Sequence, residues 1–247
     1  MNEIEIIRPS WPSPKSVEAI STTRTGGFSV APFNSLNLAD HVGDTTDVVN
    51  RNRELVAGLF AKGAKGQWLQ QVHSNRVARV ESSVEPLEAD ALVTSNRGIV
   101  LNILTADCLP LLLCSEDGNE IAAVHCGWRG LAAGIVANTL ATMDGDPDQL
   151  LAWIGPAIGS CHFEVGAEVR AAFAKSLSGD SLEHCFRPAA EGKFMADLLK
   201  ITTAQLHDLG VCQVSSDAYC TYCDADRFYS YRRDGQCGRM VTAICIT

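Results

Sequence analysis

Cys108 and His125 are the residues in this sequence whose types and spacing first point to chemistry. They lie in the stretch LTADCLPLLLCSEDGNEIAAVHCGWRG, residues 104–130. Cys108 precedes one apolar run and His125 stands near the end of the next, with a turn signal at Asp117-Gly118 between them. The pattern predicts a two-stranded antiparallel hairpin with a two-residue turn. A glycine- and arginine-containing loop, GWRG, follows directly.

The expected register of this hairpin decides whether the cysteine and the histidine meet. A two-residue turn places Cys114 opposite Ile121, Leu112 opposite Ala123 and Pro110 opposite His125. Cys108 and His125 are then diagonal neighbours on one face, roughly 7–8 Å apart at the backbone. At that separation a thiolate and an imidazole can converge on one metal ion. Cys126 points to the opposite face of the strand, so we do not expect it to be a ligand.

Two protein ligands are too few for a stable zinc site, because a catalytic zinc usually has three and keeps a fourth position open. The third ligand must come from a distant part of the chain. His73, in LQQVHSNRV, ends a predicted strand between polar neighbours, and His162, in GSCHFE, is the alternative. The residue pattern favours His73 only slightly. Cys108 and His125 are also consistent with an ordinary packed hairpin.

The elements that must position these residues follow from hydrophobic periodicity and from caps. Strands are expected at 16–24, 67–74, 98–108, 109–115, 120–126, 150–159 and 239–247, and helices at 43–60, 129–143, 165–177 and 193–210. Hairpins are mixed with helices, so we predict an α+β (mixed α/β) fold. It should be a layered sandwich of mixed sheets with flanking helices, forming a single catalytic domain over residues 1–247.

Composition excludes several classes of partner. The net charge of −9 argues against nucleic acid or an anionic membrane as the main partner. We expect no membrane segment, because no apolar run approaches the roughly 18–20 residues that a span needs. Residues 1–15 have no apolar core of signal-peptide length, so we expect a cytoplasmic protein whose ten cysteines are thiols. The oligomeric state cannot be read from the sequence.

A series of motifs between residues 22 and 235 resembles one known family. These are TTRTGGFS, NSLNLADHVGD, NRNREL, QVHSNRV, TADCLPLLL, AAVHCGWRG, IGPAIGSCHFEVG and FYSYRRDG. They are similar to the laccase-like polyphenol oxidase family, whose members are also described as zinc-dependent purine nucleoside phosphorylases. The resemblance implies that His73, Cys108 and His125 bind one zinc ion. It also implies phosphorolysis of adenosine, inosine, guanosine and methylthioadenosine, together with deamination of adenosine.

The implied substrates are purine nucleosides and phosphate, and phosphate requires donors. Arg24, Gly26 and Gly27 of TTRTGGFS and Arg129 of GWRG are the candidates, since the arginine fork binds phosphate bidentately. Arg232 and Arg233 are weaker candidates. The loop at 127–130 also opens a predicted helix, whose free N–H groups favour an anion. Asp107 is the candidate catalytic carboxylate, orienting water or a ligand histidine. The alternative is that it only caps the turn at the end of the strand.

Four alternatives compete with this interpretation. A copper-dependent polyphenol oxidase can use the same nitrogen and sulfur ligands, but six scattered histidines cannot furnish a multicopper centre. A cysteine hydrolase would use Cys108 as nucleophile and His125 as base. A deaminase or zinc-ribbon site at Cys220 and Cys223 lacks the partner motif that either requires, so these two residues are expected to be loop thiols. A binding module without turnover is the remaining possibility.

Overall fold

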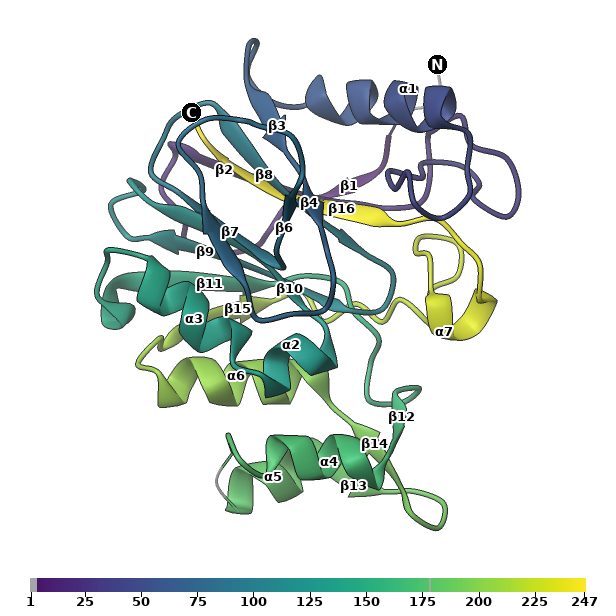
Figure 1. Cartoon of the computed structure of the whole chain (residues 1–247), viewed down its shortest axis with the longest axis vertical. Helices are drawn as coiled ribbons and strands as arrows, with labels where there is room; N and C mark the ends of the chain where they lie inside the picture. The colour runs from purple at the N-terminus through teal and green to yellow at the C-terminus, as the bar shows by residue number, and fades with distance from the viewer. Residues whose placement is uncertain (1–3, 178) are drawn as a thin grey trace.

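The computed structural model describes residues 4–177 and 179–247; residues 1–3 and 178 of the predicted domain lie outside this description. Two large sheets face each other (Figure 1). One sheet runs in the order β1 (Ile6–Ile7), β2 (Val17–Thr22), β16 (Met240–Ile246), β8 (Ile99–Thr105) and β3 (Lys65–Gln67). The other runs in the order β15 (Gln213–Ser216), β11 (Leu150–Ile154), β9 (Leu109–Ser115), β10 (Ile121–Cys126), β7 (Ala91–Thr94) and β5 (Val77–Arg79).

Two small sheets and seven α-helices complete the described part of the chain. The small sheets are β12 (Glu164–Gly166) with β14 (Lys193–Ala196) and β13 (Phe186–Pro188), and β4 (Leu69–Gln70) with β6 (Leu87–Glu88). The helices are α1 (Thr46–Ala57), α2 (Trp128–Ala132), α3 (Ile135–Thr142), α4 (Ala167–Phe173), α5 (Gly179–Cys185), α6 (Leu198–Asp208) and α7 (Tyr231–Asp234). A short 3₁₀ turn covers Pro147–Gln149.

These elements form layers that bury the sheets on both faces. Helix α1 covers the outer face of the five-stranded sheet, while α3 and α6 cover the outer face of the six-stranded sheet (Figure 1). Strands β7, β9 and β11 are consequently buried over nearly their whole length, which explains their continuous apolar sequences. Parallel and antiparallel pairs occur in both sheets. The predicted mixed α+β sandwich is confirmed.

The alternation of side chains along β10 determines the side of the sheet toward which His125 points. Ala122, Val124 and Cys126 pack into the core on the helix side. Ile121 and Ala123 pack into the core between the two sheets, and His125 shares their face by the two-residue period of a strand. Cys126 therefore points away from His125's side, as predicted.

The predicted hairpin register is correct, but its turn is different. Strand β9 pairs with β10 through Cys114–Ile121, Leu112–Ala123 and Pro110–His125. The N–H of Ser115 bonds to the carbonyl of Glu120, so the loop spans the four residues 116–119. Gly118 alone in this loop has a positive φ, 71°, whereas the predicted two-residue turn needs two such residues. The predicted two-residue loop and the observed four-residue loop are compatible with the same strand register, so the predicted pairing is correct although the turn is not.

Two predicted helices are wrong in extent. The helix expected at 129–143 is broken between α2 and α3 by Gly134, whose φ of 86° is incompatible with a continuous helix. Residues 193–196 of the helix expected at 193–210 form β14 instead, and Asp197 caps α6 by accepting from the N–H of Lys200. None of the helices in the described residues has the length and apolarity to cross a bilayer.

Candidate metal centre and its cavity

The structure brings together the three predicted ligands His73, Cys108 and His125. Their candidate ligand atoms all lie within 4.8 Å of one another. The sulfur of Cys108 is 3.8 Å from Nε2 of His73, and the two imidazole rings meet edge to face, 4.8 Å apart at their centroids. Cys108 immediately precedes β9, His125 lies near the end of β10, and His73 is in the loop after β4. The arrangement suits a metal with nitrogen and sulfur ligands.

A buried carboxylate that the sequence reasoning missed fixes both histidines. Oδ1 of Asp90 is 2.8 Å from Nδ1 of His125, and this carboxylate is 0% exposed. The contact leaves Nε2 as the ring nitrogen that is free for a metal. Such a carboxylate–histidine pair orients the ring and increases its basicity. No strand was predicted at 91–94, so nothing in the sequence analysis indicated that Asp90 lies beside β10.

The same carboxylate holds the loop that carries His73. The backbone N–H groups of Val72, His73 and Ser74 all donate to Asp90, as does the hydroxyl of Ser74. His73 has a φ of 60°, which is unusual for a residue with a side chain and requires such support. The loop is also tied to β8, because the amide of Gln71 makes paired hydrogen bonds with the backbone of Leu104.

Gly127 makes room for the centre. A Cβ at this position would lie 2.8 Å from Cδ2 of His73, 3.4 Å from the sulfur of Cys108 and 3.5 Å from Cε1 of His125. Its φ of −68° and ψ of 151° are open to any residue, so the glycine is required by space and not by backbone conformation. The three ligand side chains thus surround a cradle that a single methyl group would fill.

Charges at the centre are those of a site prepared for a cation. Burial opposes ionisation of Cys108, but His125 and His73 outweigh it and lower the pKa of the thiol to about 6. Burial likewise opposes charge on His125, but the Cys108 thiolate and Asp90 raise its pKa to about 9. Burial also opposes ionisation of Asp90, but hydrogen bonds from His125 and Ser74 lower its pKa to about 2. The extra proton on His125 occupies the place that a metal would take.

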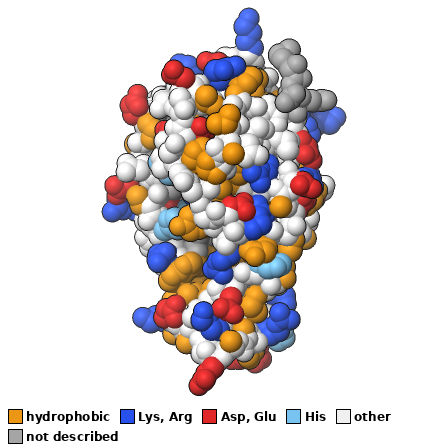
Figure 2. Space-filling view, turned by 90° about the vertical axis from the view of Figure 1, so that its right-hand side faces the viewer, with side chains coloured by type: hydrophobic (Ala, Val, Ile, Leu, Met, Phe, Trp, Pro, Cys, Tyr) orange, Lys and Arg blue, Asp and Glu red, His pale blue; other side chains and the backbone are white. Residues whose placement is uncertain are grey.

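The centre opens into a cavity of about 550 Å³ with a cationic lining. Arg129, Arg232 and Arg239 give it three cations against the single carboxylate of Asp107, and His41 also lines it. Figure 2 shows lysine and arginine side chains gathered in the middle of the molecular face that carries α7. Because the whole chain has a charge of −9, this local excess of cations indicates an anionic ligand. Arg239 and His41 were not among the predicted site residues.

Arg129 differs from the other two arginines of the cavity. The guanidinium of Arg232 donates to the carbonyl of Glu164, and that of Arg239 donates to the carbonyls of Cys237 and Gly238. The guanidinium of Arg129 lies 4.6 Å from the Trp128 ring and has no hydrogen-bond partner within residues 4–177 and 179–247. Since α2 is only five residues long, the predicted anion site depends on this side chain and not on a helix dipole.

Asp107 lines the cavity, but its carboxylate is already engaged. Oδ1 accepts from the hydroxyl of Thr221 at 2.6 Å, and Oδ2 accepts from the N–H of Arg232 at 2.7 Å. Asp107 has a φ of 93°, and its carbonyl accepts from the N–H of Ile158. These bonds hold the segments that carry Thr221, Arg232 and Ile158 at the rim. The catalytic role of Asp107 stays a prediction.

The structure does not bring Arg24, Gly26 and Gly27 into the cavity lining. The guanidinium of Arg24 donates to the carbonyls of Asn34 and Ala225 and lies over the Tyr229 ring. A Cβ on Gly27 would be 2.3 Å from the carbonyl oxygen of Ser35, so this glycine permits close backbone packing. Phosphate binding by this loop stays a prediction.

The other residues named from the sequence have different surroundings. The guanidinium of Arg233 donates to the carbonyls of Thr221, Tyr222 and Phe228, as a structural brace. His162 does not approach the centre and instead joins Cys161, Cys220 and Cys223.

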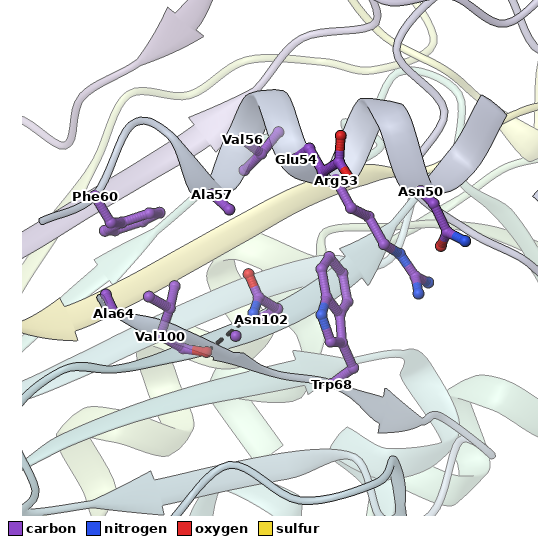
Figure 3. Close-up of a pocket in the computed structure, with 11 residues that line it drawn as sticks. Asn50, Arg53, Glu54, Val56, Ala57, Phe60, Ala64, Trp68, Val100 and Asn102 are labelled. Carbon is purple, nitrogen blue, oxygen red and sulfur yellow. Dashed lines mark hydrogen bonds between the residues drawn. The ribbon is translucent and has the colours of Figure 1, made fainter. Parts of the chain in front are cut away.

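A second cavity, of about 380 Å³, lies between α1 and the β3–β8 edge (Figure 3). Phe60, Trp68 and Val100 give it apolar walls, and the guanidinium of Arg53 lies 4.3 Å from the Trp68 ring. Its lining contains neither histidine nor cysteine. We therefore place the candidate chemistry in the cavity that holds the three ligands.

Replacing Asp90 should weaken metal binding. In Asp90→Asn the negative charge behind His125 is lost while the shape is kept, so we expect about 10- to 100-fold weaker zinc binding. Competition with a chromophoric chelator measures the affinity. Asp144→Asn, at a carboxylate that is 84% exposed, is the matched control and should bind zinc as the unmodified protein does. Unchanged affinity in Asp90→Asn would contradict the positioning role.

Adding one methyl group at the cradle should have a similar effect. In Gly127→Ala the Cβ must displace His73, and overpacking of this kind costs about 1–3 kcal/mol. Taken from metal binding, that is about a 5- to 150-fold loss of affinity. Gly58→Ala is the control, because Gly58 has a φ of −66° and its Cβ would meet nothing closer than 3.4 Å. Equal affinities for the two variants would show that the cradle tolerates a side chain.

Known proteins similar to this chain identify its family. The family described as "Multi-copper polyphenol oxidoreductase laccase" matches residues 18–247. The chain is 41% identical over 243 residues to a protein of Haemophilus influenzae named purine nucleoside phosphorylase, covering 98% of this chain and 99% of that protein. It is 43% identical to purine nucleoside phosphorylase YfiH of Escherichia coli, with 97% and 98% coverage.

Solved structures extend the similarity to three dimensions. Protein NMB0706 of Neisseria meningitidis superimposes with a TM-score of 0.93 at 39% identity, covering 98% of each chain. YlmD of Geobacillus stearothermophilus superimposes with a TM-score of 0.91 at 28% identity, covering 100% of this chain and 99% of that one. With the family model, the fold and nearly the whole length matched, this chain belongs to the laccase-like polyphenol oxidase family, in which curated members carry the name purine nucleoside phosphorylase.

Proposed function

We propose that this protein is a zinc-dependent purine nucleoside phosphorylase acting on adenosine, inosine, guanosine and methylthioadenosine. The observation that carries the proposal is the arginine without a hydrogen-bond partner in the described chain, Arg129, which shares one cavity with the triad His73, Cys108 and His125. Names of relatives at 41–44% identity support the reaction class. The individual substrates rest on the family resemblance.

In this proposal Arg129 binds the phosphate. Its guanidinium offers a planar set of N–H donors without having to give up an internal hydrogen bond. Arg232 and Arg239 contribute positive charge at the rim while their donors stay on backbone carbonyls. A phosphate bound here would lie in the same cavity as the metal ligands, which is the proximity that attack on a ribose carbon requires.

The apolar part of the cavity lining binds the nucleoside. Leu104, Ile158, Phe163 and Tyr231 lie on the cavity wall. Tyr231 is 61% exposed, so its side chain is accessible to a flat ligand. Aromatic faces of this kind stack on purine bases.

The triad suits zinc, with two imidazoles and one thiolate. Three protein ligands leave a zinc ion one position, and an ion held in this way polarises phosphate or activates water. We extend the proposal to adenosine deamination, because the same site then serves water in place of phosphate. Asp90 holds the ligand ring of His125 in either reaction.

A cysteine hydrolase is the second candidate, and one observation favours it. Cys108, His125 and Asp90 form a thiol–imidazole–carboxylate series in which the pKa of the thiol is lowered to about 6. That is the order of groups in a nucleophilic triad. Metal dependence separates the candidates, since a metal-bound thiolate is not a free nucleophile.

Ten free thiols and the local chemistry also support the expected location and partners. We propose a cytoplasmic enzyme, because the thiols are suited to a reducing compartment. Its proposed partners are nucleosides and phosphate, for which the support is the cavity lining and the family resemblance.

Removing the metal should abolish turnover. We expect free adenine and ribose 1-phosphate to form from adenosine only when phosphate is present. A chelator should stop this reaction and added Zn²⁺ should restore it. Mass spectrometry of the products from a nucleoside panel, with and without phosphate, provides the measurement. Turnover that survives complete chelation but is lost on alkylation would support the cysteine hydrolase, and phenol oxidation requiring copper would support the oxidase.

Arg129→Ala should weaken phosphate binding selectively. Removing one charge-assisted hydrogen bond costs about 1.5–3 kcal/mol, so the KM for phosphate should rise about 10- to 100-fold. Zinc content and melting temperature should be nearly unchanged, and deamination should suffer less than phosphorolysis. Arg187→Ala, at an exposed arginine outside the cavity lining, is the control and should be neutral. Equal loss of both reactions would mean that Arg129 holds the nucleoside instead.

A further inference from the structure

A second group of metal-ligating side chains lies outside the candidate active site. Cys161 and His162 come from the connection between β11 and β12, and Cys220 and Cys223 from the loop after β15. One ligand atom from each of the four residues lies within 4.8 Å of the others. Nearly sixty residues of sequence separate the two pairs, which is why the Cys-x-x-Cys at 220–223 looks isolated in the sequence.

Four of the six distances between these atoms are close to the edges of a zinc-centred tetrahedron. With Zn–S of about 2.3 Å and Zn–N of about 2.0 Å, tetrahedral angles place sulfur atoms about 3.8 Å apart and sulfur and nitrogen about 3.5 Å apart. The sulfur of Cys161 lies 3.9 Å from that of Cys220 and 3.6 Å from that of Cys223. Nδ1 of His162 lies 3.1 Å from the first and 3.4 Å from the last of these sulfur atoms. A disulfide would need about 2.05 Å.

The surroundings hold the four side chains in this arrangement. The imidazole of His162 stacks on the Tyr222 ring, with centroids 3.9 Å apart and planes 15° apart. The backbone N–H of Gly159 donates to the sulfur of Cys220 at 3.2 Å, the type of bond that stabilises a thiolate. A Cβ on Gly159 would lie 3.2 Å and 3.3 Å from the sulfur atoms of Cys220 and Cys161. Like Gly127 at the first centre, this glycine leaves space for ligands.

We propose that Cys161, His162, Cys220 and Cys223 bind a second Zn²⁺ ion in a closed, structural site. Three sulfurs and one nitrogen are one of the donor sets found in structural zinc sites, and four protein ligands leave no position for a substrate. A cation also resolves the electrostatic conflict of three adjacent thiols, which cannot all ionise beside one another without it. The candidate active site, with three ligands and an open cavity, is of the other type.

The position of this site gives it a role in shaping the cavity. Ile158 and Phe163, on one of the two joined segments, line the cavity of the first centre. Thr221, on the other segment, donates to Asp107, and its N–H bonds to the carbonyl of Ala157. Zinc bound between the segments would fasten the wall of the active site to the loop that supports Asp107. The site is at the surface, since Cys161 and Cys223 are both exposed.

Metal stoichiometry tests the proposal. Protein purified under reducing conditions with zinc present should contain two Zn²⁺ per chain by elemental analysis. Cys161→Ser/Cys223→Ser and Cys108→Ala should each contain one. Cys212→Ser, at an exposed cysteine outside both groups, should retain two. Replacement of zinc by Co²⁺ gives an independent readout, because the thiolate-to-cobalt absorption of the double variant should fall to the intensity expected for one sulfur ligand.

The unmodified protein provides a test that does not depend on the folding of a variant. Titration with a competing chelator should release zinc in two separate steps, of one equivalent each. One zinc per chain in the unmodified protein, all of it lost in Cys108→Ala, would overturn the proposal. So would a disulfide among Cys161, Cys220 and Cys223 in the freshly purified protein, detected by thiol counting, because these residues would then form a redox pair.

Discussion

The buried carboxylate of Asp90 is the interaction on which the metal centre depends. It is charged and fully enclosed, so it is stable only if its oxygens are satisfied by donors. Those donors are Nδ1 of His125 on β10 and the backbone of the loop that carries His73. One side chain therefore joins two ligands from unrelated parts of the sequence. Cys108 needs no such tether, because it directly precedes β9, which is paired with β10.

Local patterns sufficed for the part of the site that lies on one hairpin. The apolar alternation and the turn signal between Cys108 and His125 fix which residues face each other, and the register is the same for a two-residue or a four-residue loop. The residue pattern favoured His73 over His162 only slightly, because it contains no information about which distant segment approaches the hairpin. The choice is made by Asp90, which reaches the His73 loop only through the pairing of β7 with β10.

The arginines also show that residue types alone do not reveal long-range partners. Arg24 and Arg129 occupy similar glycine-containing loops, and residue types alone treat them alike. In the structure Arg24 donates to two backbone carbonyls, whereas the Arg129 guanidinium has no hydrogen-bond partner in the described chain. The single helix expected at 129–143 failed for a local reason, since Gly134 adopts a left-handed conformation that periodicity does not detect. The long-range hydrogen-bond partners of a side chain and the backbone conformation of a glycine therefore cannot be predicted from a single sequence.

The double-sided burial of β10 has a consequence for how this protein can change over evolutionary time. His125 and Cys126 point to opposite sides of the strand, and apolar layers enclose both sides. Loss of one residue within Ile121–Val124 would turn the sulfur of Cys126 toward the metal and bury the imidazole among aliphatic groups. A change of length at the hairpin loop, where Glu116, Asp117 and Asn119 are exposed, leaves this alternation intact, so the constraint on length falls on the strand itself.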